Sequence, residues 1–457
     1  MEYNIQIILL FTNIFINTIV LSTVTPGIPL LDNEWWGPTH LQLLNNTSIR
    51  PFRIQFHEEM IKDLRYRLIN HRPFTPPLEG VGFEYGFNTN YLHSWVDYWA
   101  NDYRFKERED ILNQFPQYKT NIQGLDVYFL WVKPHVPHNM TIVPLLLLHG
   151  FPGSVVEFFK SIPLLTSVSK DRDFAVEVIV PSLPGFGFSE SAIRPGLGAT
   201  EMGVVLRNLM HRLGFEKFYV HGGDYGAYVG FSIANLYPKE TLGYHTNLAL
   251  SMNIKSAALW VLGSISPSWV MSPVVVDRAY PILEYLIWLM QESGYFHVQA
   301  SKPDTIGVAV SDSPAGLLAY VLQLFSSGSR RKYLQRTDGG LDDLYSRDEL
   351  LDNLMMYWVP NSFATSCRIY AETVNVRMFK LGILSEPTPV PTWTIHAKDE
   401  IFYQSPIMLK VKYPNLLHST VLPSGGHFLA LEDPEIFSED VLKALATFRA
   451  WHNKQNP

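Results

Sequence analysis

The sequence predicts an α/β fold in which a mostly parallel sheet is covered by helices on both faces and carries a helical lid. Apolar strand candidates such as VYFLWV (127–132) and PLLLLHG (144–150) alternate with helix candidates such as ATEMGVVLRNLMHRLGF (199–215). Near-continuous apolar strands separated by helices are typical of a parallel sheet buried on both faces. From about residue 251 to 385 the pattern changes to apolar helix-like segments, and strand candidates return at VPTWTIHAKDE (390–400). A sheet that is interrupted by helices and then resumes indicates a core with an inserted lid.

The same pattern divides the chain into five consecutive parts. The stretch FHEEMIKDLRYRLINHR (56–72) has apolar residues at helical spacing and predicts an amphipathic helix ahead of the first strands. We expect this region to pack on the core. The predicted parts are a membrane anchor (1–24), an N-terminal segment (25–120), the first half of the core (121–250), the lid (251–385) and the second half of the core (386–457).

The N-terminus predicts a membrane-spanning helix. No charged residue occurs from Ile5 to Val24, a stretch long enough to cross a bilayer. A cleaved signal peptide is the alternative, but it usually has a positive start, and no Lys or Arg precedes Arg50. We therefore favour a retained anchor. Three triplets, which begin at Asn45, Asn46 and Asn139, fit the N-glycosylation pattern. They are not glycosylated if the domain faces the cytosol.

Composition excludes several classes of function. The chain of 457 residues is 47% hydrophobic and 17% charged, which suits a large soluble core better than a polytopic membrane protein. A net charge of −7 gives no basic surface for nucleic acid. The one cysteine, Cys367, excludes an internal disulfide and a cysteine-based metal cluster, and no HExxH motif occurs. We therefore expect no metal and no cofactor.

The motif GGDYG (222–226) lies between a predicted strand and a predicted helix. It has the small-x-nucleophile-x-small form of a tight strand-to-helix turn. Such a turn needs glycine on either side of its tip and presents the central residue above the carboxyl ends of the strands. An esterase would carry serine there, whereas this chain carries Asp224, a carboxylate nucleophile. The alternative is that Asp224 only caps the helix that follows.

Two further motifs complete a candidate catalytic set. A predicted strand ends in His149-Gly150-Phe151-Pro152, the kind of loop that supplies backbone N–H groups to an oxyanion hole, although His149 also fits an ordinary turn. His427, in a glycine-rich loop near the C-terminus, fits a general base, which comes last in the chain order of such sets. The acid should follow a late strand, where both Asp399 and Glu400 are candidates.

On these motifs the chain resembles the microsomal epoxide hydrolases, and within that family most closely the juvenile hormone epoxide hydrolases of insects. The resemblance runs from the N-terminal anchor to the C-terminal histidine and implies an α/β-hydrolase fold. The motifs that carry it are DNEWWGP (32–38), TPPLEGVGFEYGFNT (75–89), HGFPGS (149–154), GGDYG (222–226), ESGYFHVQASKPDTIGVAVSDSP (292–314), CRIYAE (367–372) and GGHF (425–428).

The resemblance also implies a role for each site residue. Asp224 is the nucleophile, His427 the general base and Glu400 the acid that orients it, while Tyr295 and Tyr370 hold the epoxide oxygen. The sequence departs from the family in two places, because members commonly carry tryptophan where Phe151 and Tyr225 stand. Both positions contribute a backbone N–H to the oxyanion hole, so we expect the chemistry to survive and the pocket to differ in shape.

The implied reaction adds water to a small lipophilic epoxide through an ester on Asp224. Juvenile hormone is the preferred substrate, and a broad range of xenobiotic or lipid epoxides is the alternative. The implied location is the endoplasmic reticulum membrane, with one spanning helix and the catalytic domain in the cytosol. Two other functions compete. A haloalkane dehalogenase also uses an aspartate at this turn but commonly follows it with Trp, where this chain has Tyr225, and an inactive lipid carrier could keep the fold.

Overall fold

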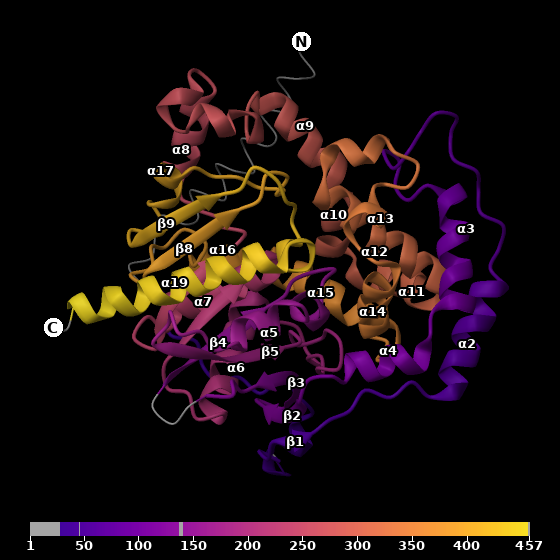
Figure 1. The fold of residues 1–457 in the computed structure, drawn as a ribbon, viewed down its shortest axis with the longest axis horizontal. Coiled ribbons are helices and arrows are strands. Elements are labelled where there is room, and N and C mark those ends of the chain that lie inside the picture. The colour runs from indigo at the N-terminus through magenta and orange to yellow at the C-terminus, as the bar shows by residue number, and fades with distance from the viewer. Residues whose placement is uncertain (1–27, 45, 137–139, 456–457) are drawn as a thin grey trace.

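One mixed β-sheet forms the centre of the molecule (Figure 1). The computed structural model describes residues 28–44, 46–136 and 140–455, and the nine strands within them belong to this sheet. Their order across the sheet is β1-β2-β3-β5-β4-β6-β7-β8-β9. The strands are Arg50–Pro51 (β1), Gln117–Ile122 (β2), Leu125–Val132 (β3), Thr141–Leu148 (β4), Phe174–Pro181 (β5), Phe218–Gly222 (β6), Thr241–Thr246 (β7), Thr392–His396 (β8) and Leu416–Val421 (β9).

Most of the sheet is parallel, as the sequence predicts. The strands from β5 across to β9 pair in parallel, whereas β1, β2 and β3 pair antiparallel at one edge. Strands β5 and β6 are buried along their whole length, which is why their sequences are nearly continuous apolar runs. The predicted start of the core at residue 121 falls inside β2, so the sheet extends into the N-terminal segment. Strand β2 is mostly polar and only half of its residues are buried, because it lies near the edge of the sheet.

Helices cover both faces of the sheet. The connection from β4 to β5 crosses the sheet in one direction, and the connection from β5 to β6 crosses back. Because parallel crossovers are right-handed, helices α5 (Ser161–Thr166) and α6 (Ala199–Arg212) lie on opposite faces. Helix α7 (Asp224–Leu236) packs beside α6, and the C-terminal α19 (Pro434–Gln455) packs beside α5. The sheet is therefore the middle layer of three.

The chain between β7 and β8 is helical and lies above the carboxyl ends of the strands (Figure 1). Its long central helix α12 (Pro314–Ser329) is the core of this lid, with Leu317, Leu318, Val321 and Leu322 almost fully buried. The α-helices of the lid are Ile254–Gly263 (α8), Ile282–Glu292 (α9), Gly294–Ser301 (α10), Pro303–Asp312 (α11), Pro314–Ser329 (α12), Leu341–Leu344 (α13), Arg347–Trp358 (α14), Phe363–Thr373 (α15) and Val376–Leu381 (α16). Short helices α17 (Pro406–Leu409) and α18 (Leu429–Glu432) follow in the second half of the core.

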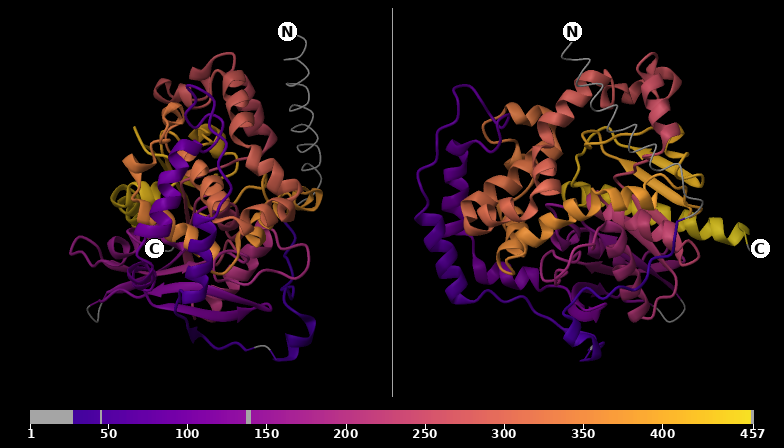
Figure 2. Two further views of the ribbon diagram at one scale, coloured as in Figure 1. Left: turned by 90° about the vertical axis from the view of Figure 1, so that its right-hand side faces the viewer. Right: turned by 180° about the vertical axis from the view of Figure 1, so that it is seen from behind.

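The N-terminal segment wraps around the outside of the lid. Its helices are Glu58–Ile69 (α2), Thr89–Asp97 (α3) and Phe105–Leu112 (α4). Helices α2 and α3 pack against α12, and α4 packs against α14, as the indigo ribbon beside the orange one shows in Figure 2. A nearly buried ion pair joins α4 to α14, since Arg108 Nε lies 3.0 Å from Asp352 Oδ1 and the Tyr103 hydroxyl donates to the same oxygen at 2.8 Å. These contacts fix the lid to the rest of the chain.

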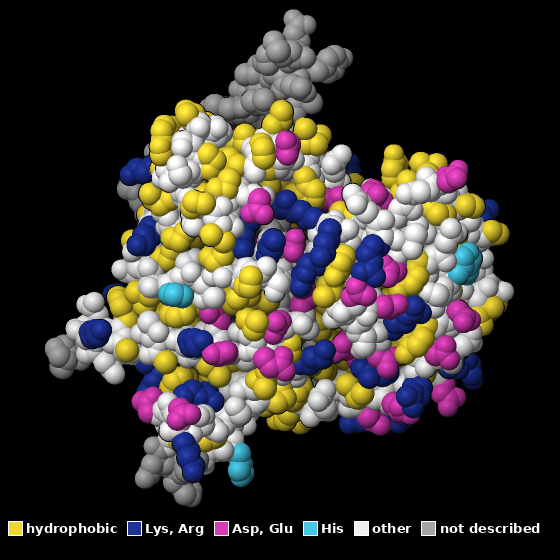
Figure 3. Space-filling model, turned by 45° about the horizontal axis from the view of Figure 1, so that its top comes forward, with side chains coloured by type: hydrophobic (Ala, Val, Ile, Leu, Met, Phe, Trp, Pro, Cys, Tyr) yellow, Lys and Arg dark blue, Asp and Glu magenta, His cyan; other side chains and the backbone are white. Residues whose placement is uncertain are grey.

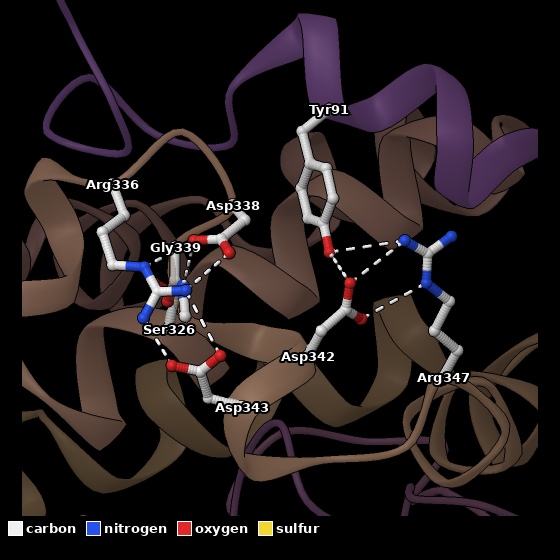
Figure 4. A network of polar contacts seen from close by, with 9 residues as sticks. Tyr91, Ser326, Arg336, Asp338, Gly339, Asp342, Asp343 and Arg347 are labelled. Atoms are coloured by element: carbon white, nitrogen blue, oxygen red, sulfur yellow. Dashed lines mark hydrogen bonds and ion pairs between the residues drawn. The ribbon is translucent and has the colours of Figure 1, made fainter.

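A second polar network joins α3 to the lid on its outer side (Figure 4). The Tyr91 hydroxyl of α3 donates to Asp342 Oδ2 at 2.5 Å, and Arg347 Nη2 lies 3.1 Å from the same oxygen. Next to it, Arg336 bonds both Asp338 and Asp343 and so closes the turn that leads into α13. The lid is therefore held from outside by charged groups as well as by its apolar core.

The predicted anchor, residues 1–24, lies outside the described residues. Within residues 28–44, 46–136 and 140–455, no single helix is long and apolar enough to cross a membrane. Helices α11 and α12 reach the required length and hydropathy only as a pair bent by 119°. Because α12 is the buried core of the lid, the high hydropathy of the pair is explained by packing of α12 inside the protein.

Candidate active site

Asp224 occupies the tip of the turn between β6 and α7. Its φ of +48° is in the left-handed region, which non-glycine residues rarely adopt and which is often found at functional sites. The N-cap of α7 is Gly223, so Asp224 does not cap the helix. The turn is also too tight for side chains on either side of it. A Cβ on Gly226 would lie 2.2 Å from the Leu148 carbonyl oxygen, and one on Gly222 would lie 2.1 Å from that of Gly226.

The loop after β4 supplies a hydrogen-bond donor to Asp224. The backbone N–H of Phe151 donates to Asp224 Oδ1 at 2.8 Å. No hydrogen bond from the Tyr225 N–H to this carboxylate occurs among the described contacts. That N–H belongs to the first turn of α7, where N–H groups have no partner within the helix, so it can still serve a developing oxyanion. One predicted oxyanion-hole donor is therefore engaged and the other is free.

His149 holds the shape of this loop. Its Nδ1 lies 2.9 Å from the Gly150 carbonyl oxygen, and its Nε2 accepts a hydrogen bond from the Leu183 N–H at 3.1 Å. This pattern requires a neutral imidazole with the proton on Nδ1. Burial lowers the pKa of His149 to about 4, which agrees with the neutral form. His149 is thus a structural residue of the loop.

The lid also grips this loop. The Asn353 side chain donates to the Pro152 carbonyl oxygen at 2.8 Å, and the Tyr357 hydroxyl donates to that of Gly153 at 2.7 Å. Both donors are on α14 and both are buried. The position of the Phe151 N–H therefore depends on the packing of the lid.

His427 and Glu400 form a buried pair beside Asp224. The Nδ1 atom of His427 lies 2.7 Å from Glu400 Oε1, and its Nε2 lies 3.5 Å from Asp224 Oδ2. The side chains of His427 and Glu400 are 5% and 2% exposed. Two hydrogen bonds fix the backbone of His427. Its N–H donates to the Gly328 carbonyl oxygen at 2.7 Å, and the carbonyl oxygen of His427 accepts from the Asn247 side chain at 3.1 Å.

The surroundings of His427 raise its pKa. Burial alone would lower it, but the charges and hydrogen bonds of Glu400 and Asp224 outweigh burial and hold the pKa of His427 well above its usual value. Asp399 does not take part, since its side chain is 21% exposed and lies 3.9 Å from Arg330 Nε. Of the two carboxylates that the sequence offered, the structure brings Glu400 to the imidazole.

Two tyrosines of the lid approach from the other side. Tyr295 on α10 and Tyr370 on α15 have ring centroids 6.0 Å apart, and the Tyr370 ring lies 5.5 Å from that of Phe151 and 4.5 Å from that of Tyr225. The Tyr370 hydroxyl is buried and lies close to the Tyr295 hydroxyl, and no other described residue hydrogen-bonds to it. Burial raises the pKa of both tyrosines, so both phenols are neutral and able to donate.

Sequence reasoning missed the residues that support the site. Asn247, Gly328 and the α14 pair Asn353 and Tyr357 come from three separate parts of the chain and contact the catalytic loops only through the tertiary fold. No local motif marks any of them. Within the described part of the chain, no cluster of three or more His, Cys, Asp and Glu side chains could hold a metal ion.

The chain matches two known families and several curated proteins. Residues 49–158 match the epoxide hydrolase N terminus family, and residues 143–275 match the α/β hydrolase fold family. The juvenile hormone epoxide hydrolase of Bombyx mori is 51% identical over 429 residues, which cover 94% of this chain and 93% of the relative. The chain belongs to the epoxide hydrolase family. Juvenile hormone epoxide hydrolase 2 of Ctenocephalides felis (46% over 435 residues; 94% and 92% covered) and epoxide hydrolase 1 of Oryctolagus cuniculus (40% over 420 residues; 90% and 92% covered) are similar as well.

Solved structures agree with this assignment. The crystal structure of the juvenile hormone epoxide hydrolase of Bombyx mori superposes on this epoxide hydrolase with a TM-score of 0.91 and covers 92% of this chain and 100% of its own. The epoxide hydrolase of Aspergillus niger, 23% identical with 88% and 97% covered, has a TM-score of 0.72 and shows the shared fold. The predicted α/β-hydrolase fold and the predicted epoxide hydrolase family are both confirmed.

Proposed function

We propose that this epoxide hydrolase works through a covalent ester on Asp224, formed in a first step and hydrolysed in a second. The observation that carries the proposal is the arrangement around one carboxylate. Oδ1 of Asp224 accepts the Phe151 N–H, whereas Oδ2 faces the imidazole of His427. The two oxygens therefore have different tasks, and Oδ2 is the one that is available to attack.

In the first step, Oδ2 of Asp224 attacks an epoxide carbon and the ring C–O bond breaks. Negative charge develops on the epoxide oxygen, and the hydroxyls of Tyr295 and Tyr370 stabilise it by hydrogen bonding and proton donation. The neutral phenols and the buried position of the Tyr370 hydroxyl beside that of Tyr295 support this role. The product of the step is an ester between Asp224 and the substrate.

In the second step, His427 takes a proton from a water molecule that attacks the carboxyl carbon of Asp224. Glu400 stabilises the imidazolium and keeps its Nε2 aimed at the nucleophile, which the 2.7 Å contact supports. The backbone N–H groups of Phe151 and Tyr225 hold the oxyanion of the tetrahedral intermediate. Collapse of that intermediate releases a vicinal diol and restores the carboxylate.

The test of this mechanism is to trap the ester. His427→Gln should leave the first step intact and stop the second, so incubation with an epoxide should add one substrate mass to the peptide that contains GGDYG. Adding Asp224→Ala should abolish that adduct. A His427→Gln variant that forms diol at the wild-type rate, or an adduct on another peptide, would refute the proposal.

We further propose juvenile hormone as the substrate. Support comes from the relatives at 51% and 46% identity, which are named as juvenile hormone epoxide hydrolases, whereas the relative at 40% identity is named only as an epoxide hydrolase. The comparison that decides is kcat/KM for juvenile hormone against styrene oxide. A higher value for styrene oxide would favour broad specificity.

We also propose that the protein is held on the endoplasmic reticulum membrane by residues 5–24, with its catalytic domain in the cytosol. The lid supports a membrane location, because no charged residue occurs from Ser256 to Val276 and this stretch exposes Ile265, Trp269 and Val274 by 72%, 61% and 83%. Figure 3 shows hydrophobic side chains gathered on that part of the surface. Resistance of the full chain to carbonate extraction is the expected result, whereas release of a shortened chain into the medium would show a cleaved signal.

A further inference from the structure

A small cavity lies directly beside the nucleophile. About 10 Å³ of it is open to a water-sized sphere, close to the 10–15 Å³ that one bound water needs. Neither Tyr295 nor Tyr370 lines it, so it is separate from the place where the epoxide oxygen would be held. The lining residues are Gly150, Phe151, Gly153, Glu157, Gly223, Asp224, His427 and Phe428.

One lining residue, Glu157, has no part in the mechanism proposed above. It is on the short helix η3 (Val155–Phe158), which follows the oxyanion-hole loop. Its carboxyl group packs against Gly153, where a Cβ would lie 2.7 Å from Glu157 Oε2. No hydrogen bond or ion pair joins this carboxyl group to another described residue. Its hydrogen-bonding capacity is therefore free at the wall of the cavity.

Burial and the charges of the site shift the pKa of Glu157. The pKa of Glu157 is raised to about 8, chiefly by burial; the charge of His427 opposes this shift, and the charges of Asp224, Glu400 and Glu432 add to it. At neutral pH this carboxyl is mostly protonated. Its carbonyl oxygen can then accept a hydrogen bond without placing another negative charge beside Asp224.

We propose that this cavity is the site of the hydrolytic water and that Glu157 is a positioning residue for it. The inference rests on the proposed function, since it concerns the second step. One O–H of the water donates to His427 Nε2 and the other donates to Glu157. The water oxygen then has a lone pair directed at the carboxyl carbon of Asp224.

The atoms balance along this path. The water oxygen bonds to the carboxyl carbon of Asp224 as one proton passes to His427 Nε2. The bond between that carbon and Oδ2 then breaks, and the alcohol oxygen of the product takes a proton from the imidazolium. The second proton of the water is left on the new carboxyl group, and its transfer to the tyrosine that protonated the epoxide oxygen in the first step restores both the Asp224 carboxylate and the neutral phenol. Glu157 gains and loses no proton, and its only task is to fix the second O–H of the water.

The test separates the two steps in the full-length enzyme. Rapid quenching with intact-protein mass spectrometry gives the rate at which the ester forms and the rate at which it disappears. Glu157→Leu removes the acceptor at similar size, Glu157→Gln keeps a carbonyl acceptor, and Glu157→Ala is a second deletion if the leucine variant does not fold. Glu435→Gln, an exposed position at the start of α19, is the matched control.

We expect Glu157→Leu to slow ester hydrolysis about 10- to 100-fold, the effect of removing one hydrogen bond from a buried reactant. Ester formation should stay within about threefold, and Glu157→Gln should restore most of the hydrolysis rate. Wild-type hydrolysis in both deletion variants, or equal slowing of both steps, would overturn the positioning role. Absence of any adduct on Asp224 in the His427→Gln background would instead overturn the proposed function, so the two failures are distinguishable.

Discussion

Replacement of Glu400 by glutamine tests the proposed acid and, with Asp399→Asn beside it, tests which carboxylate has that role. The Glu400 variant keeps the size and one acceptor oxygen of the side chain but removes its charge. The contact that changes is the 2.7 Å approach of Glu400 Oε1 to His427 Nδ1, in which both side chains are at most 5% exposed. Asp399→Asn changes a carboxylate that is 21% exposed and 3.9 Å from its nearest cation, Arg330.

The magnitudes follow from the burial of the two carboxylates. Breaking a buried ion pair by removal of one partner costs about 3–5 kcal/mol. Here that cost falls on the imidazolium that forms when His427 takes a proton from water. At about 1.4 kcal/mol for each factor of ten, hydrolysis of the ester should slow by about two to four orders of magnitude. The Asp399–Arg330 pair is long and only partly buried and does not touch His427, so we assign it about 0–1 kcal/mol, as is typical of weak surface pairs, and expect Asp399→Asn to slow the enzyme by less than about fivefold.

The assay is single-turnover kinetics with detection of the covalent adduct. In Glu400→Gln the ester should form and then persist, whereas Asp399→Asn should behave nearly as the wild type does. The reverse order of the two variants would move the role of the acid to Asp399. Equal and small effects would mean that His427 needs no carboxylate partner, and the electrostatic reasoning would fail.

Three further results are expected. A single turnover in ¹⁸O-labelled water should place the label in the carboxylate of Asp224, and label in the diol instead would exclude the ester. Tyr295→Phe and Tyr370→Phe should each slow adduct formation by about 10²–10³-fold, the usual effect of losing one oxyanion donor, and adduct formation at the wild-type rate in the double variant would remove both from the mechanism. Asp352→Asn should lower the free energy of unfolding by about 3 kcal/mol in denaturant titrations, because it leaves the nearly buried Arg108 with only the longer 3.7 Å pair to Asp348, and a loss below about 1 kcal/mol would show that the Asp352 pair is not stabilising.

The central strands of the sheet could be predicted from the sequence, whereas the strands near its edge could not. Strands β4, β5 and β6 are apolar and buried on both faces, so their sequences differ plainly from those of helices and loops. Strand β7, TLGYHT, was not predicted, since its small and polar residues give no apolar run although the strand is almost wholly buried. Strands β1 and β2 were not predicted for a different reason, because short strands at the edge of a sheet carry polar residues.

Prediction of the site followed the same division between local and distant signals. The turn that carries Asp224 is local, and its glycines are required by steric limits that the sequence makes visible. The choice between Glu400 and Asp399 is not local, since neighbouring residues on one loop differ only in which way they point. Glu157 had no signal at all, because its importance depends on a cavity that His427 and Asp224 close from elsewhere in the chain.

The 3.5 Å approach of His427 Nε2 to Asp224 Oδ2 couples the pKa of the base to the charge of the nucleophile. Before reaction, the charge of Asp224 is one of the influences that raise the pKa of His427, which favours the protonated imidazole over the free base. Formation of the ester erases that charge, so the pKa of His427 must fall at the moment when a base is first needed. Under the proposed mechanism, formation of the covalent intermediate therefore makes His427 a better base for hydrolysis of that intermediate. Activation of water follows ester formation, and this order needs no conformational change.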